Sequence, residues 1–219
     1  MEQLMLSVSE TIPPLVRVVD DDAQVRGLVT ALCTGHGLDV ESYSSAEELL
    51  SRIDVRRPGC IVTDFSMPGL SGIEMHERLL RCGVQIPIIV ISGNLDVSTA
   101  IRAMKNNPVD VLEKPFLPRV LLNRIESAIE RDRIIRQDSA QSTLISRRLA
   151  RLTGREREVL DLIVAGYPNK RIARALDITE KTVEAHRARL MRKLEARNAV
   201  ELTRIALKTG PVGELQPTN

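Results

Sequence analysis

Acidic, hydroxyl and ammonium side chains follow four apolar segments that have the composition of buried strands. They are the run Asp20-Asp21-Asp22 and the single residues Asp64, Ser92 and Lys114. Because the carboxyl ends of parallel strands meet at one edge of a sheet, these side chains can share a site. Carboxylates crowded together repel one another and favour a divalent cation, and hard oxygen ligands indicate Mg²⁺. One carboxylate can then attack phosphorus, while the hydroxyl and the ammonium hold the phosphoryl oxygens.

An alternation of strand and helix patterns positions these residues. Strands are expected at 15–20, 38–43, 60–64, 87–92 and 109–114, and helices at 23–37, 45–53, 73–82, 97–106 and 117–137. The alternation predicts an α/β fold, a doubly wound five-stranded parallel sheet over residues 15–137 that ends in a long helix. Residues 138–151, rich in Ser, Gln and Arg, predict a partly helical linker. A small all-α domain is expected over 152–210, with helices at 152–166, 169–177, 179–195 and 199–210.

The two parts of the chain carry opposite charge. The 219 residues have a formal net charge of +2, but residues 1–130 hold 12 Lys and Arg against 18 Asp and Glu, a net charge of −6. Residues 131–219 hold 19 basic against 11 acidic residues, a net charge of +8. The split indicates two units with different partners, and the basic unit suits a polyanion such as nucleic acid.

Composition argues against several other classes of protein. The three cysteines and three histidines lack the spacing of a disulfide framework or of a zinc site. No apolar run approaches the roughly 20 residues of a membrane helix. The first residues also lack the basic and apolar regions of a signal peptide. We therefore expect a cytoplasmic protein without a membrane partner.

Apolar residues at helical spacing give the segment 179–195 one inward face. They are Val183, Leu190, Met191 and Leu194. Basic and polar residues cover the rest, as in a helix-turn-helix whose second helix enters the major groove while basic residues grip phosphates. A merely solvated face has the same composition, so this segment alone leaves both interpretations open. Earlier in the same part of the chain, Thr153 and Glu156 have the spacing of a capping box.

Residues 15–130 resemble the receiver domain of two-component response regulators. The resemblance rests on the segments VVDDD (18–22), VTDFSMPGLSG (62–72), IVISG (89–93) and LEKPF (112–116). It implies that Asp64 is the phosphoacceptor. It also implies that Asp21 and Asp22 form the acidic pair that binds Mg²⁺ with Asp64, and that the backbone carbonyl of Ser66 is a further ligand.

The same resemblance assigns the residues that respond to phosphorylation. Ser92 is the hydroxyl that moves onto the phosphoryl group, Lys114 pairs with Asp64 or its phosphate, and the Lys114–Pro115 bond is expected to be cis. Receivers usually carry Phe or Tyr three residues before this lysine, and here Val111 stands in that place. The chain therefore lacks the large ring that usually turns inward on activation.

Residues 152–208 resemble the LuxR-type helix-turn-helix of the FixJ/NarL response regulators, and the Glu-x-His-Arg variant is closer to FixJ. The matching segments are LTGREREVLDLIVAG, NKRIARALDI and TEKTVEAHRARLMRKLEARN. The resemblance implies phosphate contacts by Lys170, Thr179, Lys181, Thr182, Arg187 and Lys193, and base contacts by Glu184, Ala185 and Ala188. NarL-like members often carry Lys where this chain has Glu184, but a glutamate can accept from cytosine N4 and so still read sequence. Glu156 is expected to be structural, capping a helix and pairing with a basic residue.

Together the two resemblances imply a transcriptional regulator rather than an enzyme. A sensor histidine kinase would phosphorylate Asp64 and so alter the face of residues 97–106, 109–113 and 117–137, which is the usual dimer contact in the family. The regulator would then form a homodimer, and the choice of receiver face stays open because family members differ. The dimer would bind double-stranded promoter DNA, with RNA polymerase as a further partner.

Three alternatives remain open. A phosphatase of the HAD type would use a similar strand-end Asp, but it normally has a DxD motif where this chain has Asp64-Phe65-Ser66. A constitutive, phosphorylation-independent DNA-binding regulator with a weakened receiver is favoured by Val111 and opposed by the complete set of acidic, hydroxyl and lysine residues. An interaction module without transcriptional output is opposed by the basic second part.

Overall fold

The computed structural model describes residues 12–93 and 110–207, which form two compact units. The first unit runs to Arg136 and the second begins at Gln137. The helix expected at 97–106 and the first residue of the strand expected from 109 lie outside the described residues.

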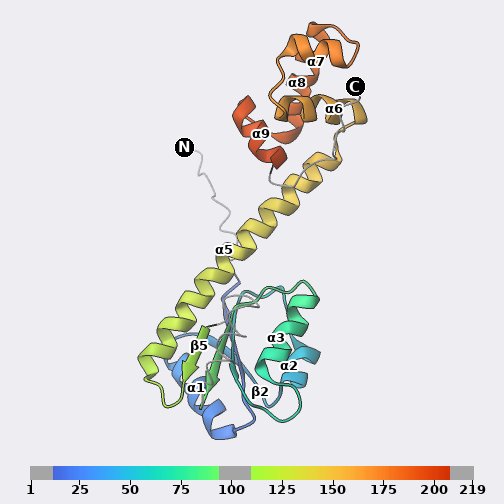
Figure 1. Cartoon of the computed structure of the whole chain (residues 1–219). Helices are drawn as coiled ribbons and strands as arrows, with labels where there is room; N and C mark the ends of the chain where they lie inside the picture. Colours follow the sequence, from blue (N-terminus) through green and yellow to red (C-terminus); the bar gives the residue numbers. More distant parts are fainter. Residues whose placement is uncertain (1–11, 94–109, 208–219) are drawn as a thin grey trace, which may run out of the picture. The chain divides into compact units, whose positions relative to one another are not determined.

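The first unit is built on a five-stranded parallel sheet in the order β2-β1-β3-β4-β5 (Figure 1). Its strands are β1 (Leu15–Val19), β2 (Asp39–Tyr43), β3 (Gly59–Asp64), β4 (Ile88–Ser92) and β5 (Asp110–Glu113). The strands β1, β3 and β4 are rich in Val and Ile and are buried throughout, as expected for parallel strands covered on both faces. This order confirms the predicted doubly wound sheet, in which the strand order reverses between β1 and β3. In such sheets ligands bind outside the carboxyl ends of the strands at this reversal.

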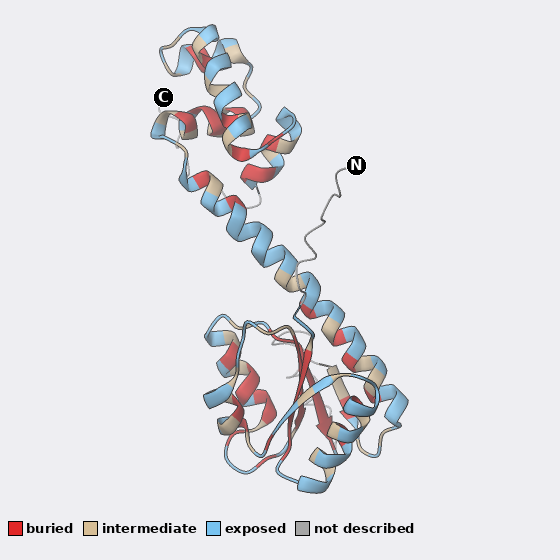
Figure 2. Cartoon of the chain, turned by 180° about the vertical axis from the view of Figure 1, so that it is seen from behind, coloured by how far each residue is buried: buried red, intermediate tan, exposed pale blue. Residues whose placement is uncertain are grey.

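Helices cover both faces of this sheet. They are α1 (Ala23–Gly35), α2 (Ala46–Arg52), α3 (Gly72–Arg81) and the start of α5 (Pro118–Ala150). On one face, α1 and α5 bury Val29 and Leu121 against the strands, and on the other α2 and α3 bury Leu49 and Leu79. Figure 2 shows the buried strands between helices that are buried only on their inner sides. The core is almost wholly aliphatic, in keeping with the 2% aromatic content of the chain.

Buried polar groups fasten α5 to the start of β3. The carboxylate of Asp132 accepts hydrogen bonds from the backbone N–H of Gly59 at 2.8 Å and from Nε of Arg136 at 2.6 Å. The Arg136 guanidinium also donates to the three backbone carbonyls of residues 55–57. Gly59 has φ of +142°, and a Cβ there would overlap the backbone of β1. The strand that ends in Asp64 is therefore tied at its other end to α5.

The residues expected to form a linker, 138–151, are continuous with α5, which ends only at Ala150. Residues 137–144 are all exposed and mostly polar, so they carry no apolar stripe from which a full helix could be predicted. The helix is stabilised at its ends instead, by Leu121 in the first core and by Ile145 and Leu149 in the second. Between such ends each added residue contributes one helical hydrogen bond without a new nucleation step.

The second unit packs four further helices around an aliphatic core. They are α6 (Gly154–Val164), α7 (Asn169–Ala175), α8 (Glu180–Leu194) and α9 (Ala199–Leu207). Val183, Leu190 and Leu194 of α8 are buried and Met191 is partly buried, which confirms the predicted inward face. The predicted capping box at the start of α6 is also confirmed, with Thr153 and Glu156 each accepting from the other's backbone N–H.

Candidate functional site

Asp64 and Lys114 meet at the carboxyl edge of the sheet. The Nζ atom of Lys114 donates to Oδ1 of Asp64 at 2.6 Å and lies 3.6 Å from Oδ2 of Asp20. Asp20 and Asp64 are only 3% and 9% exposed. Asp64 ends β3, Asp20 follows β1, and Lys114 follows β5, so three separate strands bring these groups together.

The structure corrects the expected acidic pair. Asp22 does not join the pocket, because it is the N-cap of α1 and its Oδ1 accepts from the backbone N–H groups of Gln24 and Val25. Asp20 takes the buried place beside Lys114, and Asp21 is exposed at the same strand end. The signal was present in the sequence, since Asp20 directly continues an apolar strand and Asp22 directly precedes a helix, where Asp is a favoured N-cap.

The loop that leaves Asp64 is held close to it. The backbone N–H of Ser66 donates to Oδ2 of Asp64 at 2.9 Å, and the N–H of Phe65 donates to the carbonyl of Ile91 at 2.8 Å. Gly72, the first residue of α3, lies so close that a Cβ there would be 2.6 Å from the Asp64 carbonyl oxygen. Both oxygens of the Asp64 carboxylate thus have a fixed donor, Lys114 on one and Ser66 on the other.

Burial and charge shift the pKa values of two groups in the pocket. Burial raises the pKa of the Asp20 carboxyl, and the negative charges of Asp64 and Asp21 raise it further. The hydrogen bond from the Asp22 N–H and the positive charge of Lys114 lower this pKa but do not outweigh burial. Burial alone would lower the pKa of Lys114, but its hydrogen bond to Asp64 and the nearby carboxylates outweigh burial and raise it. The pocket therefore places excess negative charge around one fixed ammonium, an arrangement that attracts a further cation.

The oxygen donors at this edge fit Mg²⁺. Asp20 and Asp64 supply buried carboxylates, Asp21 is an exposed one, and the Ser66 carbonyl is the further ligand that the family resemblance implies. Among residues 12–93 and 110–207, no three His, Cys, Asp or Glu side chains form a ready-made cage for a metal ion. Mg²⁺ usually retains several waters and takes one or two carboxylates together with phosphate oxygens, so it needs no such cage.

The remaining predicted receiver residues lie on β4, on β5 or directly after β5. Ser92 ends β4 with 3% exposure, and its carbonyl accepts from the backbone N–H of Lys114 at 2.7 Å. The Lys114–Pro115 peptide bond is cis, as expected. Val111 lies on β5 beside Val90 and packs partly buried against the core under α2 and α3.

The predicted DNA-contacting residues divide into exposed and engaged groups. Lys170 on α7 and Lys181, Glu184, Ala185 and Ala188 on α8 are exposed, and Arg187 is half-buried. Thr179 is the N-cap of α8, and its hydroxyl lies 2.8 Å from that of Thr182, so these two hydroxyls also shape the start of the helix. The exposed side chains form a surface on α8 opposite its buried stripe.

Lys193, one of the residues expected to contact phosphate, makes contacts within the second unit. Its Nζ donates to Oε2 of Glu156 at 2.6 Å and to the carbonyl of Arg151 at 3.2 Å. Glu156 is 3% exposed, and the hydrogen bond from Lys193 is the largest cause that lowers its pKa to about 2. The predicted structural role of Glu156 is confirmed, and its basic partner is Lys193, for which the family resemblance implies a phosphate contact.

Comparison with protein families shows which family the chain belongs to. Residues 16–126 match the response regulator receiver domain, and residues 150–206 match the bacterial regulatory proteins of the luxR family. The chain is 42% identical over 195 residues to the transcriptional regulatory protein FixJ of Rhizobium meliloti strain 1021, covering 89% of this chain and 96% of that protein. The chain belongs to the LuxR-type response regulators. It is thus a two-component, DNA-binding transcription regulator, a class of regulators rather than of enzymes.

Other LuxR-type response regulators are similar to this chain over about nine tenths of its length. FixJ of Bradyrhizobium diazoefficiens is 38% identical over 91% of this chain and 97% of its own. The solved structure of the response regulator StyR is 37% identical and superimposes with a TM-score of 0.78 over 90% of this chain and 99% of its own. Such regulators have a histidine kinase as partner and act on DNA, and their receivers generally bind Mg²⁺ at the phosphorylation site. Within the described part of this chain, no helix has the length and apolar character needed to span a membrane.

Proposed function

We propose that this response regulator accepts a phosphoryl group on Asp64 from a sensor histidine kinase, and that the modification alters its dimerisation and DNA binding. The observation that carries the proposal is the 2.6 Å contact between Lys114 and Asp64 in a pocket shared with Asp20. An Asp64 oxygen attacks phosphorus, the bond from phosphorus to the donor imidazole nitrogen breaks, and its electron pair stays on that nitrogen. When bound by Asp20, Asp21, Asp64 and the Ser66 carbonyl, Mg²⁺ would neutralise charge on the phosphoryl oxygens.

The residues around Asp64 can respond to its phosphorylation. The modification adds about −1.5 to −2 charges and three strong acceptor oxygens. Lys114 already contacts Asp64, so its ammonium can form a hydrogen bond to the new phosphoryl oxygens. The hydroxyl of the buried Ser92 can donate a second hydrogen bond to these oxygens. Ser92 and Lys114 lie on adjacent strand ends, which would carry the change into the segments that follow β4 and β5.

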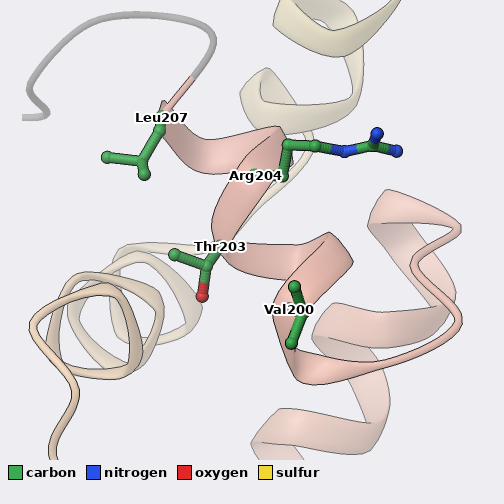
Figure 3. A pocket seen from close by; sticks show the side chains of 4 residues that line it. All are labelled: Val200, Thr203, Arg204 and Leu207. Atoms are coloured by element: carbon green, nitrogen blue, oxygen red, sulfur yellow. The ribbon is translucent and has the colours of Figure 1, made fainter.

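Exposed apolar side chains on α9 of the second unit support the proposed homodimerisation. Val200 and Leu207 on α9 are 80% and 62% exposed, and with Thr203 and Arg204 they line a shallow pocket (Figure 3). Burial of these apolar side chains against a second copy would remove them from water. The receiver face that is the usual dimer contact in this family includes residues 97–106, which lie outside the described part.

The exposed face of α8, together with Lys170 of α7, supplies the proposed DNA contact. Lys170, Lys181 and Arg187 would neutralise phosphates, while Glu184, Ala185 and Ala188 would face base edges in the major groove. We divide the chain accordingly into a receiver (15–137), a helical linker (138–151) and a DNA-binding domain (152–210). We place this activity in the cytoplasm, and we include promoter-bound RNA polymerase among the expected partners.

A second candidate function is DNA binding that does not depend on phosphorylation. It is favoured by Val111, because a valine on β5 cannot provide the ring rotation through which receivers of this family usually signal. Under this alternative the pocket at Asp64 would still bind metal, but the DNA affinity would not respond to a phosphodonor.

Lys181→Ala is expected to weaken binding to selected and to scrambled DNA about equally. The side chain is exposed on α8. The slope of log affinity against log salt is negative, and losing one phosphate contact should reduce its magnitude by about one for each bound copy of the chain. The measurement is fluorescence anisotropy at several salt concentrations on a duplex recovered from a random pool. Arg52→Ala, which removes an exposed positive charge from α2 of the first unit, is the matched control and should leave the salt slope unchanged. Equal slopes for the wild type and Lys181→Ala would show that Lys181 makes no phosphate contact.

A further inference from the structure

The loop between Asp64 and α3 is contacted by a side chain from a different helix. Oε1 of Glu47, in the first turn of α2, accepts a hydrogen bond from the backbone N–H of Leu70 at 3.0 Å. The two residues are 23 positions apart in the sequence, and no part of the receiver motifs pointed to Glu47. This contact therefore joins α2 to the loop that carries the Ser66 carbonyl.

The turn under Glu47 is shaped to receive a carboxylate. Gly69 has φ of +80°, and a Cβ there would lie 2.9 Å from Oε1 of Glu47. Leu70 and Met67 turn their side chains into the core, which leaves the backbone of the turn facing α2. A larger residue at position 69 would thus both strain the backbone and displace the carboxylate.

The Glu47 carboxylate lies among several groups that favour its charged form. Its own backbone N–H is the largest cause that lowers its pKa, and the Leu70 N–H and the Ser45 hydroxyl act in the same direction. The charge of Arg78, on α3, acts in the same direction. Glu47 is thus charged at neutral pH and accepts a hydrogen bond from the backbone of the loop.

We propose that Glu47 is a positioning residue for the Asp64 site, holding the Gly69-Leu70 turn and so the loop whose Ser66 carbonyl is an expected Mg²⁺ ligand. The inference rests on the proposed function, since it is the metal-assisted phosphorylation of Asp64 that needs this carbonyl in place. One end of the loop is fixed at Asp64 itself through the Ser66 N–H, and Glu47 fixes the other end. Glu47 touches neither the metal nor the phosphoryl group.

The test compares the full chain as wild type, Glu47→Ala and Glu47→Gln, with Glu48→Ala as the control. The Glu48→Ala control removes a carboxylate from the same turn of α2. The Glu48 side chain contacts Ser44 and Arg52 instead of the loop. Three quantities are measured: hydrogen exchange of the Leu70 amide without metal, calorimetric affinity for Mg²⁺ alone, and the urea midpoint. For Glu47→Ala we expect about tenfold faster exchange and about fivefold weaker Mg²⁺ binding. Glu47→Gln and Glu48→Ala should stay within about twofold of the wild type, because the amide oxygen still accepts and the control leaves the loop untouched.

The outcomes separate this inference from the proposed function. Unchanged Mg²⁺ affinity in Glu47→Ala, beside a wild type that binds the ion, would overturn the positioning role even if the urea midpoint fell. Weak binding in Glu47→Gln with a protected Leu70 amide would assign the effect to charge and would also overturn it. A wild type that binds no Mg²⁺ would instead refute the metal site of the proposed function, and the inference with it.

Discussion

Replacing Asp64 with Asn is expected to abolish covalent phosphorylation of the chain. With acetyl phosphate and Mg²⁺, intact mass should show one added phosphoryl group on the wild type and none on the variant, a reduction of at least about 100-fold in rate. The substitution keeps the shape of the side chain, but the amide nitrogen or oxygen is a far poorer nucleophile than a carboxylate. It also removes the charge that Lys114 meets at 2.6 Å.

Asp54→Asn is the matched control for this experiment. Asp54 is a half-exposed carboxylate that pairs with Arg56 in the loop before β3, at the opposite end of that strand from Asp64. Its loss should leave the added mass unchanged. Phosphorylation of Asp64→Asn at the wild-type rate would place the modification on another residue and contradict the proposed phosphoacceptor.

Glu156→Ala is expected to cost about 3 kcal/mol of unfolding free energy in the second unit. The carboxylate is buried at the start of α6, where it accepts from the backbone and hydroxyl of Thr153 and from Lys193. Its removal leaves the Thr153 N–H without its acceptor and the Lys193 ammonium without its carboxylate. The measurement is urea unfolding followed by circular dichroism. Glu158→Ala, an exposed residue of the same helix, should change stability by no more than about 0.5 kcal/mol.

The same residue gives the stability a defined dependence on pH. The pKa of Glu156 is lowered from 4.5 to about 2 in the folded protein. Its stabilising contribution is therefore fully present above pH 4.5 and is lost as the pH falls toward 2. The difference in stability between the wild type and Glu156→Gln should shrink over that interval. A difference that stays constant from pH 6 to pH 3 would show that the charge of Glu156 does not contribute.

Much of the fold could be predicted from the sequence because its signals are local. Continuous Val and Ile runs mark β1, β3 and β4, and the Thr153–Glu156 spacing marks the start of α6. The length of α5 could not be predicted in this way. Residues 137–144 have no apolar stripe, and the helix there depends on side chains packed at its two ends.

The candidate site was predictable in residue type but less so in residue assignment. Asp64, Ser92 and Lys114 fall at strand ends, as the motifs imply. In the run of three aspartates, Asp20 is buried and Asp22 caps α1 because the strand stops at Val19. A strand end shifted by one residue would give these roles to different aspartates. The contacts of Lys193 with Glu156 and of Glu47 with Leu70 join residues far apart in the sequence, and no local pattern indicates them.

The most direct test of phosphorylation control is the DNA affinity of the full chain before and after treatment with acetyl phosphate and Mg²⁺. The DNA is the duplex recovered from the random pool, and intact mass confirms modification of Asp64 in the same samples. We expect the wild type to bind at least about tenfold more tightly after treatment, and Asp64→Asn to show no change, a coupling within the usual range for two linked sites. A fully phosphorylated wild type whose affinity does not change would contradict the proposed control and identify a regulator that binds DNA regardless of Asp64.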